Sequence, residues 1–236
     1  MKHTSIHALI IGGGIAGPAL SLFLKQAGIS SAVYEAYPCT EGVGGGLSLA
    51  PNGMNVLQEL GLAETVKSRG TVALEMCFRS ETGRVLARIN NGGKRYGQPA
   101  VALRRADLYE VLAQEMQRHG IPIACNKRVT DISYSSDYKK VVAHFADGSD
   151  AEGDLLIGAD GIHSQTRTSV FPESPKPAYV GITGIGGFVP LSAVPGLTDR
   201  DRQSLNFTFG HRGFFGYCGA RPGEVMWWSN LWARRI

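Results

Sequence analysis

The segment from Ser5 to Glu35 constrains the fold of this chain more than any other stretch. Ile6–Ile11 is short, apolar and rich in β-branched residues, which predicts a buried parallel strand. Three glycines follow in the spacing G-x-G-x-x-G. They are Gly12, Gly14 and Gly17. We expect a helix to continue to about Ala27, with Gly28 as the residue that ends it, and a second strand over 32–34. The order is strand, glycine turn, helix, strand.

Each glycine in this spacing has its own physical role. Gly12 permits a tight turn out of the strand, Gly14 lets a pyrophosphate approach the backbone, and Gly17 lets the helix pack closely on the strand. The phosphates would then lie at the helix N-terminus, where unpaired N–H groups and the helix dipole favour negative charge. Ile15 and Ala16 lie inside this turn, so we include them among the expected contacts.

Glu35 ends the second strand, where a carboxylate can accept hydrogen bonds from both ribose hydroxyls of a dinucleotide. With 31 glycines in 236 residues, three spaced glycines alone prove little, and a glycine-rich turn of another α/β protein is the first alternative. A signal peptide is the second, because residues 8–24 carry no charge. Glycines and Pro18 interrupt that apolar run, so the ordered combination favours a dinucleotide site.

Composition places the chain among ordinary globular proteins. Its 236 residues can bury a sizeable core in one or two domains, and 43% of them are hydrophobic and 19% charged. The formal net charge is +4, but Lys and Arg are scattered, so we expect no nucleic-acid partner, and no membrane partner either. The six histidines show no metal-ligand spacing, and we expect no metal site.

The four cysteines stand far apart and form no C-x-x-C pair. They are Cys39, Cys77, Cys125 and Cys218. We interpret them as reduced thiols of a cytoplasmic protein rather than as a disulfide framework or a zinc site.

A loop over 36–46 ends in a run of three glycines, Gly44, Gly45 and Gly46. Such a run lets the backbone pass close to a flat group such as a cofactor ring, although a flexible loop explains it equally well. We expect a helix near 54–60 after it, with Asn52 as the N-cap and Gly61 as the stop.

From residue 71 the pattern changes to antiparallel strands. Residues 72–79 and 84–89 predict a hairpin, which suggests a second sheet. Further strands with alternating apolar and aromatic residues are expected at 206–209, 213–217 and 225–228. Their aromatic side chains could line a pocket for a flat apolar ligand, while ordinary sheet core explains about half of them.

Two later junctions place polar residues at strand ends. A strand over 101–103 and a helix over about 106–119 leave Arg105 between them, a place suited to a phosphate contact. The buried strand in 154–158 delivers Asp160 and Gly161 to its C-terminal end, the edge at which α/β sheets bind ligands.

Three separated signals now align: GGGIAG with Glu35, R-x-x-L-x-x-x-L beginning at Arg105, and GADGIHSQTR at 158–167. Together they resemble the class A flavoprotein monooxygenases, the para-hydroxybenzoate hydroxylase type, and residues 42–62 resemble the same family. The resemblance implies an α/β fold with a Rossmann-like FAD-binding domain and an inserted antiparallel-sheet substrate domain. The implied FAD-binding domain comprises 1–70 and 100–172, and the implied substrate domain comprises 71–99 and 173–236.

The resemblance also implies a set of cofactor-binding residues. They are Gly12, Gly14, Ile15, Ala16, Gly17, Glu35, Gly45, Gly46, Arg105, Asp160 and Gly161. Gly12, Gly14, Gly17 and Glu35 would hold the ADP half of FAD. Arg105 would contact the pyrophosphate or ribityl region, where Asp160 would hydrogen-bond and Gly161 would allow close approach. Gly45 and Gly46 would lie near the isoalloxazine, and Arg167 would anchor its local helix.

In this family NAD(P)H reduces the flavin, and one oxygen atom of O2 is transferred to an aromatic or polycyclic small molecule. Nothing in the sequence singles out a catalytic acid or base. The family's third flavin motif, of the form G-D-A-A-H, has no counterpart before Ile236, so we expect the substrate sheet to be incomplete at its C-terminus. A non-catalytic or split-chain FAD-binding fragment is the alternative, and an NAD-dependent dehydrogenase that shares only the first motif is a third possibility.

Overall fold

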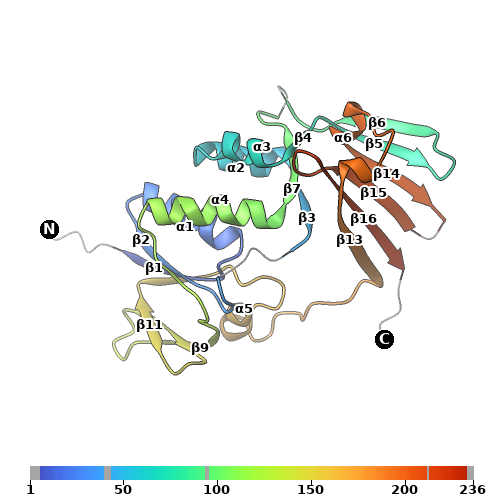
Figure 1. Ribbon diagram of the computed structural model, residues 1–236. Coiled ribbons are helices and arrows are strands. Elements are labelled where there is room, and N and C mark those ends of the chain that lie inside the picture. Colours follow the sequence, from blue (N-terminus) through green and yellow to red (C-terminus); the bar gives the residue numbers. More distant parts are fainter. Residues whose placement is uncertain (1–5, 40–43, 94–95, 212, 233–236) are drawn as a thin grey trace. The chain divides into compact units, whose positions relative to one another are not determined.

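The computed structural model describes residues 6–39, 44–93, 96–211 and 213–232, and Figure 1 shows its helices and strands. Contacts divide the chain into two compact units. Unit 1 comprises Met1–Gly42 and Tyr109–Ala178, and unit 2 comprises Val43–Leu108 and Tyr179–Ile236. Each unit has its own sheets and its own hydrophobic core. The domain boundaries implied by the resemblance stay a prediction.

Unit 1 is built on a parallel sheet with the strand order β12-β1-β2-β8. The strands are β1 (His7–Ile11), β2 (Ser30–Tyr34), β8 (Ile123–Ala124) and β12 (Leu155–Gly158). Strand β1 lies inside the sheet with Ala8, Leu9 and Ile10 fully buried, which confirms the buried strand predicted from its apolar run. Helix α1 (Ala16–Gln26) packs on β1 and β2 and ends before Gly28, whose φ of +76° confirms the predicted stop.

A second, antiparallel sheet completes the core of unit 1. Its order is β11-β10-β9, with β9 (Val129–Tyr134), β10 (Val141–Phe145) and β11 (Asp150–Gly153). Leu9 and Ile11 of β1 cluster with Ala143 and Phe145 of β10, and the Phe145 ring stacks on Tyr34 at 4.9 Å between centroids. The short helix α5 (Gln165–Val170) contacts β9 and β12. The core of unit 1 therefore packs against β1 and β2, the strands that lead to the glycine turn and to Glu35.

Helix α4 (Arg105–Arg118) follows directly on strand β7. The predicted range of about 106–119 is confirmed to within one residue. Its apolar stripe, Leu108, Val111, Leu112 and Met116, is at most 3% exposed. Within the described ranges, none of the helices has the length and hydrophobicity needed to cross a membrane.

Unit 2 contains a six-stranded sheet with the order β13-β16-β15-β14-β5-β6, drawn with the red and orange strands and the β5 and β6 pair in Figure 1. The strands are β5 (Glu75–Ser80), β6 (Val85–Asn90), β13 (Ile182–Pro190), β14 (Ser204–Gly210), β15 (Gly213–Gly219) and β16 (Glu224–Trp232). All neighbours are antiparallel except β14 and β5, which run parallel. The six-stranded sheet is therefore antiparallel at every pair of strands but one, which confirms the antiparallel sheet predicted from residue 71 onward.

A three-stranded sheet of order β3-β7-β4 packs against the six-stranded sheet. Its strands are β3 (Gly46–Leu49), β4 (Thr71–Ala73) and β7 (Ala100–Arg104). The unit also contains α2 (Pro51–Glu59), α3 (Ala63–Arg69), the 3-10 turn η1 (Leu191–Ala193) and α6 (Asp199–Arg202). Ala73, Ala100 and Ala102 of the small sheet cluster with Leu205, Cys218 and Met226 of the large one. Small side chains on one side and larger ones on the other make this core.

Two local predictions in unit 2 are wrong. Helix α2 begins at Pro51 with Ala50 as its N-cap, because proline at the first helical position already has the required φ; Asn52 lies inside the helix. The first strand of the predicted hairpin is broken at Leu74, whose N–H donates to Gln203 O at 2.8 Å. Strand β4 before it pairs with β7 and strand β5 after it pairs with β6.

The prediction of four reduced thiols is also wrong for two of them. Cys39 and Cys125 form a disulfide across 86 residues of sequence, with their Cα atoms 5.6 Å apart. Parallel pairing of β2 with β8 continues beyond both strand ends, where Asn126 N donates to Tyr37 O at 3.2 Å, and this brings the two cysteines together. The other two cysteines are free and buried, and burial raises the pKa of the Cys218 thiol well above its ordinary value.

Candidate functional site

At Gly12, in the turn between β1 and α1, there is room only for glycine. Its φ is +114°, and a Cβ there would collide with the backbone carbonyl of Ala159 and lie 2.9 Å from Asp160 N. Its own N–H donates to Tyr34 O at 2.8 Å. Gly12 therefore brings three chain segments, the ends of β1, β2 and β12, within backbone contact.

The N-terminus of α1 carries no side chain that caps it. Its N-cap is Ile15, which makes no side-chain cap hydrogen bond, and the first turn contains no acidic residue. Gly14 and Ile15 are half-buried, Ala16 is exposed, and a Cβ at Gly17 would collide with Gly12 O. Uncapped N–H groups at the start of an eleven-residue helix are suited to bind an anion.

Glu35 is fastened to the glycine turn by a residue that sequence reasoning missed. Gly13 N donates to Glu35 Oε2 at 2.7 Å, and Tyr37 N donates to Oε1 at 3.0 Å. A Cβ at Gly13 would lie 2.9 Å from Glu35 Cβ, so only glycine allows this approach. The signal was the first pair of glycines in GGGIAG. Each carboxylate oxygen of Glu35 accepts one hydrogen bond from a backbone N–H and has two lone pairs. Both oxygens can therefore still accept a hydrogen bond from a hydroxyl group.

Asp160 lies at the C-terminal end of β12, as predicted, and is held by the start of α5. Its carboxylate accepts hydrogen bonds from Ser164 Oγ at 2.5 Å and from Thr166 N at 3.0 Å. Burial alone would raise the pKa of Asp160, but these hydrogen bonds hold it below its ordinary value, so the group is an anion at neutral pH. Gly161 has a φ of +79° and open space around it, and Arg167 donates to Ile162 O at 2.8 Å, as expected for an anchor of this helix.

Arg105 and the glycine run lie together in unit 2. Arg105 N donates to Gly45 O at 3.0 Å, and a Cβ at Gly44 would lie 2.8 Å from Arg105 Cδ. Gly45 is exposed, and a Cβ added there would meet no atom within 4 Å, while a Cβ at Gly46 would collide with Met226 Sδ. The predicted residues thus fall into two groups. Gly12, Gly14, Ile15, Ala16, Gly17, Glu35, Asp160 and Gly161 meet in unit 1, and Gly45, Gly46 and Arg105 meet in unit 2.

One face of the six-stranded sheet carries a continuous row of aromatic rings, the aromatic face. Its members are Phe78, Phe207, Phe209, Phe214 and Trp228, with neighbouring ring centroids 5.3 to 6.1 Å apart. Met226 lies two residues from Trp228 on β16 and so shares this face. Phe207 and Trp228 pack against the core of unit 2, whereas Phe209 is 43% exposed. The row is therefore part core and part accessible apolar surface.

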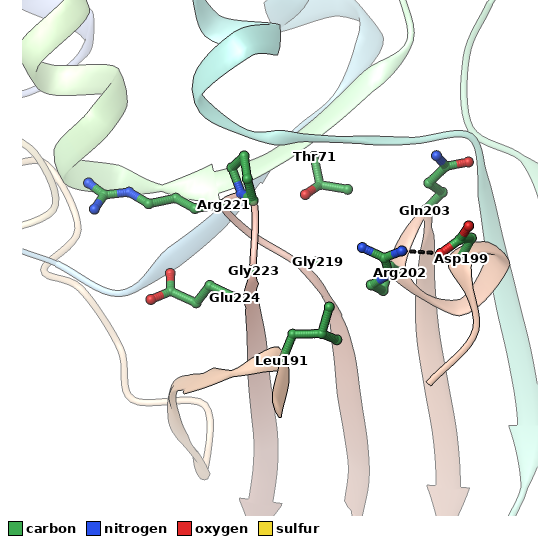
Figure 2. Close-up of a pocket in the computed structure, with 10 residues that line it drawn as sticks. Thr71, Leu191, Asp199, Arg202, Gln203, Gly219, Arg221, Gly223 and Glu224 are labelled. Carbon is green, nitrogen blue, oxygen red and sulfur yellow. Dashed lines mark hydrogen bonds and ion pairs between the residues drawn. The ribbon is translucent and has the colours of Figure 1, made fainter. Parts of the chain in front are cut away.

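A small cavity of about 150 Å³ in unit 2 contains none of the predicted site residues (Figure 2). Figure 2 shows Arg202 bound to Asp199 on one side, while Arg221 and Glu224 extend toward the other. Those two side chains pair with Asp107 and Arg104, respectively. The charged groups that line the cavity are thus paired within the protein.

Comparison with known proteins assigns this geometry to a family. A model described as an FAD binding domain matches residues 5–217. The chain is 34% identical over 208 residues to 3-amino-4-hydroxybenzoate 2-monooxygenase of Streptomyces cremeus, covering 86% of the chain and 51% of that protein. It is 33% identical over 187 residues to FAD-dependent urate hydroxylase of Klebsiella pneumoniae, covering 78% and 48%. The chain thus spans about half the length of these curated relatives.

Solved structures agree with this assignment. HpxO of Klebsiella pneumoniae, in complex with FAD and uric acid, is 26% identical with a TM-score of 0.83, over 98% of this chain and 57% of that one. CtdE, in complex with FAD and its substrate, has a TM-score of 0.84 at 21% identity and so supports the fold alone. The chain therefore belongs to the family of FAD-binding domains.

Proposed function

We propose that the protein is an FAD-dependent monooxygenase that consumes NAD(P)H and hydroxylates an aromatic or polycyclic small molecule. The observation that carries the proposal is the corner of unit 1, where the glycine turn, the uncapped start of α1 and Glu35 converge. The names of relatives support the substrate class, since they act on a hydroxybenzoate, on urate and on 6-hydroxynicotinate. Electron supply by NAD(P)H and a cytoplasmic location are parts of the proposal.

In unit 1 the residues fit the ADP half of FAD. Glu35 would accept hydrogen bonds from the ribose hydroxyls through the lone pairs that Gly13 and Tyr37 leave open. The N–H groups at the start of α1 would donate to the pyrophosphate, which Gly14 can approach because it has no Cβ. Asp160 is held as an anion by hydrogen bonds from the start of α5. It would accept hydrogen bonds from hydroxyl groups of the cofactor, while the start of α1 would bind the phosphates.

Unit 2 by itself offers a cation at Arg105 and an exposed backbone without side chains at Gly45 and Gly46. Arg105 would contact the pyrophosphate or ribityl chain with its exposed guanidinium. Gly45 and Gly46 would lie along the flavin ring, where an exposed backbone without side chains allows close approach. The aromatic face would offer flat apolar contact to an aromatic substrate.

When bound, FAD supplies the redox chemistry, namely acceptance of a hydride and transfer of one oxygen atom from O2. The chain's own residues would bind and orient the cofactor. No side chain is assigned as a general acid or base, because the residues brought together here are binding groups.

An FAD-binding chain without turnover is the second candidate, because the residues that meet at the corner of unit 1 are groups that bind a ligand. The third possibility, an NAD-dependent dehydrogenase, is overturned by the match to an FAD-binding domain over residues 5–217.

The test is a titration of the purified chain with FAD, followed by flavin fluorescence, and then NAD(P)H oxidation in the presence of 3-amino-4-hydroxybenzoate, urate or 6-hydroxynicotinate. Binding with substrate-stimulated oxidation and a hydroxylated product supports the monooxygenase. Binding without stimulated oxidation supports the second candidate. A folded chain that leaves FAD fluorescence unchanged contradicts both.

A further inference from the structure

Two arginine–carboxylate pairs flank Arg105 in unit 2. Arg104 Nε donates to Glu224 Oε2 at 2.8 Å, and its Nη2 donates to Oε1 of the same carboxylate. Arg221 Nε donates to Asp107 Oδ2 at 2.8 Å, and its Nη2 donates to Oδ1. Both pairs are bidentate, the arrangement that fixes direction as well as distance. They join the junction of β7 and α4 to the turn between β15 and β16 and to the start of β16.

Burial makes the Asp107 carboxylate more than a surface charge. Asp107 is 1% exposed, and a buried carboxylate is stable only with a partner such as Arg221. The hydrogen bond to Glu224 raises the pKa of Arg104, and the Arg104 guanidinium also lies over the Phe188 ring at 4.1 Å. Each pair is therefore well determined in geometry.

The backbone of Arg105 is fixed between them. Its N–H donates to Gly45 O at 3.0 Å, and Arg104 is paired with Gly46 in the register of β3 and β7. The side chain lies along Gly44, where a Cβ would be 2.8 Å from Arg105 Cδ. A shift of residues 104–107 would move the Arg105 side chain away from the glycine run.

The charges around Arg105 also favour a free, well-placed Arg105 side chain. Of the five charged groups, Asp107 and Glu224 engage Arg221 and Arg104, so neither carboxylate competes for Arg105. One positive charge is left at the exposed position, beside a backbone segment that carries no side chains. That is the arrangement an anion-binding arginine requires.

We propose that Asp107 and Glu224 are positioning residues that hold Arg105 in the geometry needed to bind FAD. This rests on the proposed function, in which Arg105 contacts the cofactor. Neither carboxylate touches FAD; each acts through an arginine pair on the backbone that carries Arg105.

A double-mutant cycle on FAD affinity separates positioning from general stability. We expect Asp107→Asn and Glu224→Gln each to weaken FAD binding by about tenfold in the wild-type background, and by less than about twofold in an Arg105→Gln background. Glu75→Gln is the matched control, because Glu75 also pairs with arginines in unit 2, at Arg88 and Arg200. It should leave FAD affinity unchanged in both backgrounds at a temperature where every variant is folded.

The same factor of weakening in both backgrounds, or no weakening in either, would overturn the proposal. Should Asp107→Asn fail to fold, Glu224→Gln, at the less buried pair, carries the test alone, and Asp107→Glu, which keeps the charge, should restore part of the affinity.

A second readout needs no cofactor. Hydrogen exchange of the Arg105 amide, which is bound to Gly45 O, should be at least about tenfold faster in Glu224→Gln than in the wild-type chain or in Glu75→Gln. Unchanged protection of this amide would refute the positioning role. If the wild-type chain binds no FAD while this amide responds as expected, the proposed function fails and the positioning geometry stands.

Discussion

The corner of unit 1 and the Arg105 region of unit 2 are built by different means. In unit 1 the candidate site is made of backbone: a glycine with positive φ, an uncapped helix start and a carboxylate held by a backbone N–H. In unit 2 it depends on bidentate side-chain pairs whose members lie 114 and 120 residues apart. A site made of backbone groups depends on residues that are adjacent in the sequence, so the sequence can predict it. A site made of distant side chains can be identified only in the folded structure.

The largest effect is expected at Gly12. Gly12→Val should destabilise the chain by about 4 kcal/mol or more, because the side chain would need a positive φ and would collide with the Ala159 carbonyl. Thermal unfolding checks this. Gly148→Ala is the matched control, since Gly148 has a φ of +82° but open space, and should cost only about 1 kcal/mol. Equal losses in the two variants would show that the close approach at Gly12 does not matter.

The next effect concerns the disulfide. Reduction, or Cys39→Ser, should lower the free energy of unfolding by about 2–4 kcal/mol, because the bond closes a loop of 86 residues in the unfolded chain. Denaturant unfolding with and without a dithiol measures it. A thiol assay on the denatured, unreduced chain should find the two cysteines Cys77 and Cys218. Four titrated thiols would contradict the pairing.

A smaller, pH-dependent effect is expected at Glu75. Hydrogen bonding to Arg200 lowers its pKa from 4.5 to about 2. Because the folded-state pKa lies below the unfolded one, the stability it contributes is complete above about pH 4.5 and is lost as pH falls toward 2. Allowing for solvent screening of a partly exposed group, we expect about 1–2 kcal/mol. Melting temperatures of Glu75→Gln and the wild-type chain should converge as pH falls; a constant difference would contradict this.

The features that could be predicted from the sequence are those set by residues close together in the chain. The strand, glycine turn, helix and Glu35 were predictable because each signal is local. The helix α4 was predictable because its apolar stripe repeats at helical spacing. The fold class followed from these motifs together, and the family match confirms it. The roles assigned to individual site residues stay predictions.

The missed features are those set by distant partners. The break at Leu74 depends on Gln203, and the pairing of Cys39 with Cys125 depends on how β2 and β8 run side by side. The two arginine–carboxylate pairs that flank Arg105 depend on residues more than 110 positions away in the sequence. Neither periodicity nor composition carries such information, because it arises only when the sheets assemble.

The most direct test of the central claim, that the corner of unit 1 binds the ADP half of FAD, is competition between ADP and FAD in wild type and in Glu35→Gln. The glutamine keeps an acceptor for Gly13 N–H but loses the charge and one of the two oxygens. We predict that ADP displaces FAD from the wild-type chain and that Glu35→Gln weakens both ligands by about tenfold. Glu152→Gln, at an exposed position of β11, should change neither. Failure of ADP to compete, or equal affinities in the two variants, would contradict the account.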